Sequence, residues 1–362
     1  MVCKTDFLAK KILIFSLYFS KFPHILLINM DLSIILVNYN VFDDIKVCIK
    51  NIYDQLDGLS FEIIVVDNCS VDREIEKITV LFPDVKPIFL DSNFGFGFAN
   101  NIGIQKATGN YLLLLNPDII IQDRSIQILF DVIQKNPNAG VVGPIQYKPG
   151  AGLEYYYTFF PSLYSRFMQE FGFYMKTKRM KKRFFDFLNT GVRTGKPFKV
   201  DWVIGSSMML RKEIVEKTGG FDEAFFLFEE ETEWQYRISK LGYDVLMVPE
   251  AKVLHNHHSS TRKIGVMFIL YQEYRSRIIF DIKRNEFIYS FFRRLMVINS
   301  IAFRFLYYGF TNLTSVDVMK KRIYLYWDLI KLNLSSKEKV AKNRFVFSQF
   351  VDYFTNTGNA KL

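Results

Sequence analysis

The sequence predicts an α/β fold, namely a GT-A or Rossmann-like arrangement in which a mostly parallel sheet is flanked by helices. Between Asp31 and Gly143, short apolar runs rich in β-branched residues alternate with segments of helical spacing. Strands that are apolar on both faces are typical of a parallel sheet that helices cover on each side. The 362 residues are enough for one large domain of this kind and an appendage.

The predicted elements begin with a strand over Leu32–Val37 and a helix over Phe42–Leu56, whose apolar residues recur at helical spacing. Further strands are expected at Glu62–Val66, Val85–Leu90, Tyr111–Leu115 and Val141–Ile145. Beyond them, the pattern indicates strand-like character at Lys199–Arg211, an acidic cluster within a helical pattern at Gly219–Gly242, and amphipathic helices from Val266 onward.

The domain boundaries follow from these elements. We predict a catalytic domain over residues 30–262, with an aromatic-rich insertion at 147–200, and a C-terminal helical region over 263–362. Residues 1–29 are interpreted as an N-terminal extension, because Met30 stands directly before the first predicted strand. The apolar run within this extension, Ile12–Phe19, is too short to span a bilayer.

The composition restricts the partners and the compartment. A formal net charge of +10 calls for an anionic partner such as nucleic acid, a phosphate-rich substrate or acidic lipid. Aromatic residues make up 17% of the chain, an excess that favours an apolar surface such as one facing a membrane. The three cysteines form no disulfide framework and no CxxC pair, which is typical of a reducing, cytoplasmic compartment.

Polar residues follow four of the predicted strands. They are Asn38-Tyr39-Asn40, Asp67–Asp72, Asn93–Asn101 and Asn116-Pro117-Asp118. Each loop taken singly is more typical of a turn. Because ligands of open α/β sheets bind at the carboxyl ends of the strands, the four loops together favour a nucleotide and its phosphates.

Further motifs follow in a fixed order: Val200–Ser206, Gly219–Glu223, Phe225–Trp234 and Ala251–His255. With these and the strand ends, the chain between Asp31 and about Ser260 resembles family two of the glycosyltransferases, with the GT-A fold, and most closely its rhamnosyltransferase-type members. The resemblance implies an inverting, metal-dependent transfer of a sugar such as rhamnose from a nucleotide diphosphate donor, a dTDP- or UDP-sugar. It also implies a saccharide or polyprenyl-linked acceptor in cell-surface polysaccharide synthesis.

The resemblance assigns a divalent cation, Mg²⁺ or Mn²⁺, which offsets the charge of the leaving diphosphate. Asp118 matches the final carboxylate of the family's Asp-x-Asp motif, whose first position is Asn116 here. His255 matches a histidine that adds a further ligand in many GT-A enzymes. The alternatives are a simple turn at residues 116–118 and a structural role for His255. The nearby His257 and His258 lack the spacing and the partners of a zinc site.

The same resemblance assigns the remaining site residues. Asp67 would accept the ring N–H of uracil or thymine, although helix capping is its alternative role. The other donor-site candidates are Asn38, Asn40, Asn93, Gly95, Asn101 and Asn116. The general base is expected at Glu231, with Glu230 as the next candidate, where the family usually has a Glu-Asp pair. Without the family context, acidic residues at a helix start merely complement its dipole.

The C-terminal helices combine aromatic and basic residues. Arg293, Arg294 and Arg304 interrupt the most apolar stretch, so no run reaches the ~20 residues of a spanning helix. Such helices lie at a bilayer interface or pack as a cap on the catalytic domain. We expect a cytoplasmic protein attached peripherally to the anionic inner face of the plasma membrane, with no nucleic-acid partner.

Two other functions are alternatives. A sugar-phosphate nucleotidyltransferase should carry a glycine-rich loop with Arg and Lys directly after the first strand, and residues 38–42 contain none of these. A non-enzymatic nucleotide-binding module would have no need for an acidic cluster together with Asp118 and His255.

Overall fold

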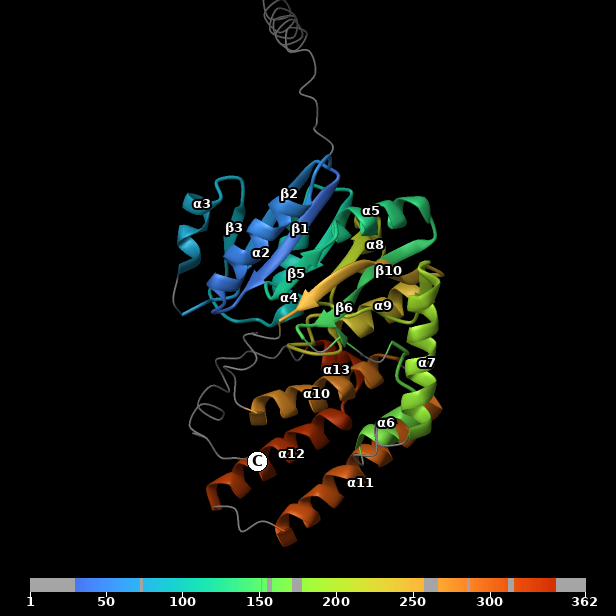
Figure 1. Ribbon diagram of the computed structural model, residues 1–362. Coiled ribbons are helices and arrows are strands. Elements are labelled where there is room, and N and C mark those ends of the chain that lie inside the picture. Colours follow the sequence, from blue (N-terminus) through green and yellow to red (C-terminus); the bar gives the residue numbers. More distant parts are fainter. Residues whose placement is uncertain are drawn as a thin grey trace, which may run out of the picture.

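The computed structural model describes residues 30–71, 74–150, 152–154, 158–170, 178–256, 266–284, 287–311 and 316–342. The predicted extension 1–29, His257 and His258 lie outside these ranges. The described residues form one ten-stranded sheet with helices on both faces, which confirms the predicted fold class (Figure 1).

The first four strands in sheet order run parallel: β3 (Lys86–Phe89), β2 (Phe61–Asp67), β1 (Leu32–Asn38) and β4 (Tyr111–Leu115). Helix α2 (Phe42–Gln55) packs on one face, in a core that includes Ile34. Helix α4 (Phe96–Lys106) packs on the other face, in a core that includes Ile35. Because alternate residues of β1 enter the two cores, its run has to be apolar throughout.

The second half of the sheet is mixed. It contains β9 (Ser207–Arg211), β6 (Ala139–Lys148), β10 (Asp244–His255) and β5 (Ile119–Gln122), with β7 (Gly152–Leu153) and β8 (Phe198–Val200) at its margins. β9 lies antiparallel between β4 and β6, whereas β6 and β10 are parallel. The predicted strand-like segment 199–211 is therefore two strands, β8 and β9, joined by the loop 201–206.

Helices α5 (Ser125–Lys135) and α8 (Lys212–Thr218) follow β5 and β9, and α9 (Glu230–Lys240) precedes β10. The short helices η1 (Glu74–Lys77) and α3 (Ile78–Leu81) precede β3 at the margin of the sheet. Of these elements, α9 matters most for the site because it begins within the acidic cluster Glu229–Glu233.

The remaining helices are α6 (Leu163–Glu170), α7 (Lys178–Thr194), α10 (Val266–Arg284), α11 (Phe287–Thr311), α12 (Val316–Asn333) and α13 (Lys337–Lys342). Helices α10, α11 and α12 lie on the side of the sheet toward which β6 and β10 run (Figure 1). A separate apolar core joins Phe226, in the loop before α9, to Phe268 of α10 and Leu329 of α12. Among the described residues, no helix has the length and apolar character needed to cross a membrane.

Candidate functional site

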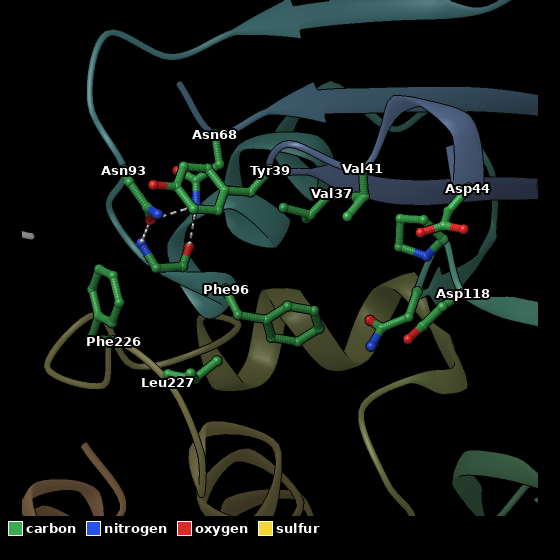
Figure 2. A pocket seen from close by; sticks show the side chains of 13 residues that line it. Val37, Tyr39, Val41, Asp44, Asn68, Asn93, Phe96, Asp118, Phe226 and Leu227 are labelled. Atoms are coloured by element: carbon green, nitrogen blue, oxygen red, sulfur yellow. Dashed lines mark hydrogen bonds between the residues drawn. The ribbon is translucent and has the colours of Figure 1, made fainter. Parts of the chain in front are cut away.

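A cavity opens at the carboxyl edge of the parallel strands (Figure 2). It is lined by Val37, Tyr39, Val41, Asp44, Asn68, Asn93, Gly95, Phe96, Asn116, Pro117, Asp118, Phe226 and Leu227. Four predicted site residues are therefore brought together here: Asn93, Gly95, Asn116 and Asp118. The sequence analysis did not single out Tyr39, Asp44 or Asn68, although Tyr39 and Asn68 lie within the polar strand ends that pointed to the site.

Asn68 organises one wall of the cavity (Figure 2). Its Nδ2 donates to Asn93 Oδ1 at 2.9 Å and to the Gly95 carbonyl at 3.3 Å, while its Oδ1 accepts from the Phe94 amide. Gly95 has a φ of 92°, and a Cβ there would come within 2.2 Å of the Phe226 carbonyl oxygen. Only glycine suits this position, because it is left-handed and also in close contact with a neighbouring backbone.

The predicted residues Asp67, Asn38 and Asn40 lie in an adjoining network and do not line the cavity. Asp67 Oδ1 accepts from Asn38 Nδ2 at 2.7 Å and from Ser70 Oγ at 2.6 Å. Its Oδ2 accepts from the Ser70 amide at 3.0 Å, and Ser70 Oγ accepts from the Asn40 amide at 2.9 Å. Both oxygens of Asp67 thus fasten the ends of β1 and β2.

Asn101, also predicted for the donor pocket, bonds the backbone of a neighbouring loop. Its side chain is buried on α4, where Nδ2 donates to the Phe221 carbonyl at 2.8 Å and Oδ1 accepts from the Phe221 amide at 2.9 Å. This pair of hydrogen bonds holds the Gly219–Glu223 loop against α4. Asn101 is not among the residues that line the cavity.

Asp118 and His255 lie next to each other because β5 and β10 pair antiparallel, with His255 opposite Ile119. The Asn256 amide donates to the Asp118 carbonyl at 3.0 Å and extends the pairing by one residue. His255 Nε2 is 3.5 Å from Asp118 Oδ1, and its Nδ1 is 3.3 Å from Glu154 Oε2. The imidazole therefore lies between two carboxylates, and Glu154 was missed because it lies 101 residues from His255 in the sequence.

These residues fit a divalent cation. Asp118 Oδ2 is buried and has no hydrogen-bond partner among the described residues. Burial lowers the pKa of His255, but the carboxylates of Asp118 and Glu154 outweigh it and raise that pKa to about 9. A cation can take the place of this proton, with Glu154 orienting the imidazole from behind. Mg²⁺ and Mn²⁺ accept few protein carboxylates where the phosphate oxygens of a nucleotide complete the shell.

The backbone before α9 is strained. Phe228 and Glu229 have φ values of 71° and 64°, a left-handed conformation that costs roughly 1–3 kcal/mol for each such residue. Arg166 of α6 compensates, since Nη1 and Nη2 donate to the two carboxylate oxygens of Glu229 at 2.9 and 3.0 Å. Arg166 Nε also lies 3.3 Å from Asp281 of α10, so one buried guanidinium joins the insertion, the acidic loop and the C-terminal helices.

The three consecutive glutamates differ in their environments. Burial raises the pKa of Glu229, but Arg166 outweighs it and the net pKa is lowered. Burial and the charge of Glu231 raise the pKa of Glu230 well above its ordinary value. Burial also raises the pKa of Glu231, to about 7, against the lowering effect of nearby backbone N–H groups. Glu231 alone therefore combines partial exposure with a pKa matched to proton transfer near neutrality.

The loop 201–206 contacts both the loop that carries Asp118 and the candidate base Glu231. The Asn116 amide donates to the Ser206 carbonyl at 2.8 Å, which fixes the loop that carries Asp118. The neighbouring Gly205 packs on Glu231, such that a Cβ on Gly205 would lie 3.2 Å from the Glu231 Cβ. The Asn116–Asp118 loop and the Glu231 side chain thus contact consecutive residues of one segment, and Glu231 Oε2 has no hydrogen-bond partner in the described structure.

Comparison with known proteins agrees with this geometry. The sequence profile of glycosyl transferase family 2 matches residues 33–219. The low-salt glycan biosynthesis hexosyltransferase Agl10 of Haloferax volcanii is 26% identical over 259 residues, which cover 69% of this chain and 75% of that protein. The N-acetylglucosaminyl-diphospho-decaprenol L-rhamnosyltransferase of Mycobacterium tuberculosis is 26% identical over 212 residues, which cover 55% of this chain and 67% of that protein.

The solved structure of GalNAc-T7 with UDP, GalNAc and Mn²⁺ resembles this chain with a TM-score of 0.52 at 16% identity. The match covers 90% of this chain and spans 58% of the length of GalNAc-T7. At this level of identity the likeness concerns the fold, which is GT-A.

Proposed function

This chain belongs to glycosyl transferase family 2 and is a glycosyltransferase, and on that premise we propose an inverting, metal-dependent transfer from a nucleoside diphosphate sugar. The sugar is a hexose or deoxyhexose such as rhamnose, and the acceptor is a saccharide, free or linked to a polyprenyl diphosphate. The two relatives, a hexosyltransferase and a decaprenol-linked rhamnosyltransferase, support this range. Family membership removes the reason to retain a nucleotidyltransferase or a non-enzymatic binding module.

In the proposed reaction, Glu231 accepts the proton of the acceptor hydroxyl as the hydroxyl oxygen attacks the anomeric carbon. The bond between that carbon and the diphosphate oxygen breaks on the opposite face, so the configuration inverts and the electron pair leaves on the nucleoside diphosphate. Asp118 and His255 are the residues that would hold Mg²⁺ or Mn²⁺. When bound, the cation neutralises the charge that develops on the departing diphosphate.

The remaining cavity residues position the donor. The cavity walls formed by Tyr39, Asn68 and Asn93 offer an aromatic face and amide groups for the nucleoside. Their amides are already fixed by the hydrogen bonds to Gly95 and Phe94, so the wall is preformed. Asp67, Asn38 and Asn40 belong to the hydrogen-bond network that joins the ends of β1 and β2.

One observation carries the proposal: the metal-side loop and the candidate base adjoin consecutive residues of one segment, since Asn116 bonds Ser206 and Glu231 packs on Gly205. A nucleotide-binding module has no use for a half-buried carboxylate with a raised pKa at that place. A glycosyltransferase requires one within hydrogen-bond reach of the acceptor hydroxyl.

We further place the enzyme in the cytoplasm, on the anionic inner face of the plasma membrane. The net charge of +10 and the aromatic C-terminal helices support this location. The M. tuberculosis relative acts on a decaprenol-linked substrate, and a lipid-linked acceptor would make proximity to a bilayer useful.

Thermal denaturation with UDP, dTDP or GDP, each with and without Mn²⁺, tests the nucleotide class and the metal together. A nucleotide at 100 times its Kd stabilises the folded state by about 2.7 kcal/mol. We expect one nucleotide to raise the Tm, and Mn²⁺ to enlarge that shift. Equal shifts with and without Mn²⁺ would contradict metal-assisted binding, and no shift with any of the three would contradict the donor class.

A further inference from the structure

Helix α11 exposes apolar side chains and turns arginines inward, the opposite of an ordinary surface helix. Its large apolar residues Phe291 and Phe292 are each 54% exposed, and Leu295 is exposed one turn further along. Its arginines point inward instead: Arg293 is fully buried and donates to Asn333 Oδ1 of α12 at 2.6 Å. Arg304 donates to the Glu170 carbonyl of α6. The charged groups of α11 thus hold neighbouring helices together, and apolar side chains face outward.

The exposed residues of α11 form one continuous stripe. At about 100° per residue, positions 291, 292, 295, 298, 299, 302 and 303 fall within an arc of roughly 140°. The buried positions 293, 297, 300 and 301 occupy the opposite side. Asn299 is the one polar residue of the exposed set, so the stripe is apolar along its described length.

Helix α12 presents a similar stripe. Ile323 and Trp327 are exposed, with Trp327 at 57%, while Leu325 and Leu329 are buried against α10. Among the α11 and α12 side chains that the structure describes, the only fully exposed charges belong to Lys320 and Lys331, both on α12. The Lys331 ammonium lies 5.7 Å from the centre of the Trp327 ring. Lysine beside tryptophan on an apolar face is typical of residues at the level of lipid headgroups.

We propose that the outward faces of α11 and α12 dock on an anionic phospholipid bilayer. Both helices pack inward on α10, so their exposed stripes point away from it. The two helices lie side by side, away from the sheet (Figure 1). The apolar stripe of α11 enters the headgroup boundary, where apolar side chains are stabilised without spanning the membrane. Lys320 and Lys331 contact lipid phosphates.

Charge favours a bilayer over a second copy of the chain as the occupant. A symmetric dimer through this face would bring the exposed lysines of both copies together, with no exposed carboxylate on the described parts of α11 and α12 to compensate. An anionic leaflet supplies the missing negative charge.

This surface is connected to the site by packing. Phe226 lines the cavity and also belongs to the apolar core shared with α10 and α12. Docking through α11 and α12 would therefore hold the cavity at a fixed height above the bilayer, an advantage that rests on the lipid-linked acceptor proposed above.

Vesicle co-sedimentation of the full chain tests the surface without donor or acceptor, so its failure leaves the proposed glycosyl transfer untouched. We expect binding to vesicles of phosphatidylglycerol with phosphatidylcholine, and much weaker binding to phosphatidylcholine alone. The double variant Phe291→Asn/Phe292→Asn should weaken binding roughly tenfold or more, because two aromatic anchors are lost. Lys320→Gln/Lys331→Gln should weaken binding to the anionic vesicles only.

The matched control is Val80→Asn/Leu81→Asn, which changes two adjacent exposed apolar residues on α3, a short helix at the other end of the molecule. It should bind vesicles as the unchanged protein does. Equal loss of binding in the control, or full binding by the Phe291/Phe292 variant, would overturn the proposal. The proposal would also be overturned if the unchanged protein bound no vesicles and formed a dimer that the Phe291→Asn/Phe292→Asn substitutions dissociate.

Fluorescence gives a second readout that locates the contact. The chain has three tryptophans, of which Trp234 is buried and Trp202 half-buried, so Trp327 is the exposed reporter. Anionic vesicles should shift the emission to the blue, and Trp327→Phe should remove that shift while co-sedimentation persists. A shift that survives in Trp327→Phe would show that another surface meets the lipid.

Discussion

Arg166 holds both carboxylate oxygens of Glu229, at 2.9 and 3.0 Å, two residues before the candidate base Glu231. The guanidinium is 1% exposed and its Nε faces Asp281, so the pair is deeply buried. It lowers the pKa of Glu229 and so favours the ionised carboxylate. This pairing separates one structural glutamate from the two that remain available for chemistry.

Removing Arg166 should destabilise the protein strongly. Arg166→Met leaves a buried carboxylate without its cation, and we expect the free energy of unfolding to fall by about 3–5 kcal/mol. Adding Glu229→Gln in the same chain should recover much of that loss, as urea denaturation would show. Lys46→Met, which breaks the exposed pair with Asp43, is the control and should leave stability almost unchanged. A double variant no more stable than Arg166→Met would show that the pair itself is not the stabilising element.

Glu231→Gln should lower kcat by about 10²–10⁴-fold, because the acceptor hydroxyl loses its base. Donor binding, measured by calorimetry with the nucleoside diphosphate, should be nearly unchanged. Glu230→Gln is the matched comparison, and its effect on kcat should be smaller because Glu230 is buried and its pKa is raised well above the ordinary value, which disfavours the ionised, proton-accepting form. If Glu230→Gln is inactive and Glu231→Gln is nearly silent, the base is Glu230.

The pH profile should report the same carboxylate. Burial raises the pKa of Glu231 to about 7, so its ionised, proton-accepting form predominates above that pH and is lost as the pH falls. We expect kcat/KM to decline about tenfold per pH unit below 7, measured with a soluble acceptor over the range in which the protein stays folded. An acid limb near the ordinary carboxyl value of about 4.3 would contradict the assignment.

Glu154 should matter for cation binding because its Oε2 faces the imidazole of His255. Glu154→Gln keeps the size of the side chain but removes the carboxylate that faces His255 Nδ1 at 3.3 Å. Loss of such a supporting carboxylate typically costs about 10–100-fold in metal affinity. Titration of Mn²⁺ by electron paramagnetic resonance, in the presence of nucleoside diphosphate, measures this directly. Glu216→Gln on α8 is a suitable control, and equal affinities of the two variants would remove Glu154 from the site.

Much of the fold was predictable because local patterns determine it. The helix predicted at 42–56 is observed at Phe42–Gln55, and α10 begins at Val266 as expected. The antiparallel insertion of β9 between β4 and β6 was not predictable, because strand order depends on contacts between residues about 70 to 100 positions apart. The inward direction of Arg293 and Arg304 of α11 was also missed, since their partners lie on α12 and α6, far away in the sequence.

The site was predicted in part for the same reason. Asn93, Gly95, Asn116 and Asp118 line the cavity because strand ends converge in any parallel sheet. Asp67 and Asn101 instead hold loops together, a difference that depends on side-chain direction and not on position along the strand or helix. Arg166 carried no signal in the sequence, because its partner Glu229 lies 63 residues away.

Turnover of Asp118→Asn at limiting Mn²⁺ tests the central claim most directly. The substitution keeps the shape of the side chain but removes the charge that would anchor the cation, so transfer should be nearly abolished. The Tm without ligands should stay close to that of the unchanged protein. Asp123→Asn, just after β5, is the matched control and should retain full activity, because asparagine tolerates the left-handed φ of 48° at that position. Near-normal turnover by Asp118→Asn at limiting Mn²⁺ would contradict the metal-assisted mechanism.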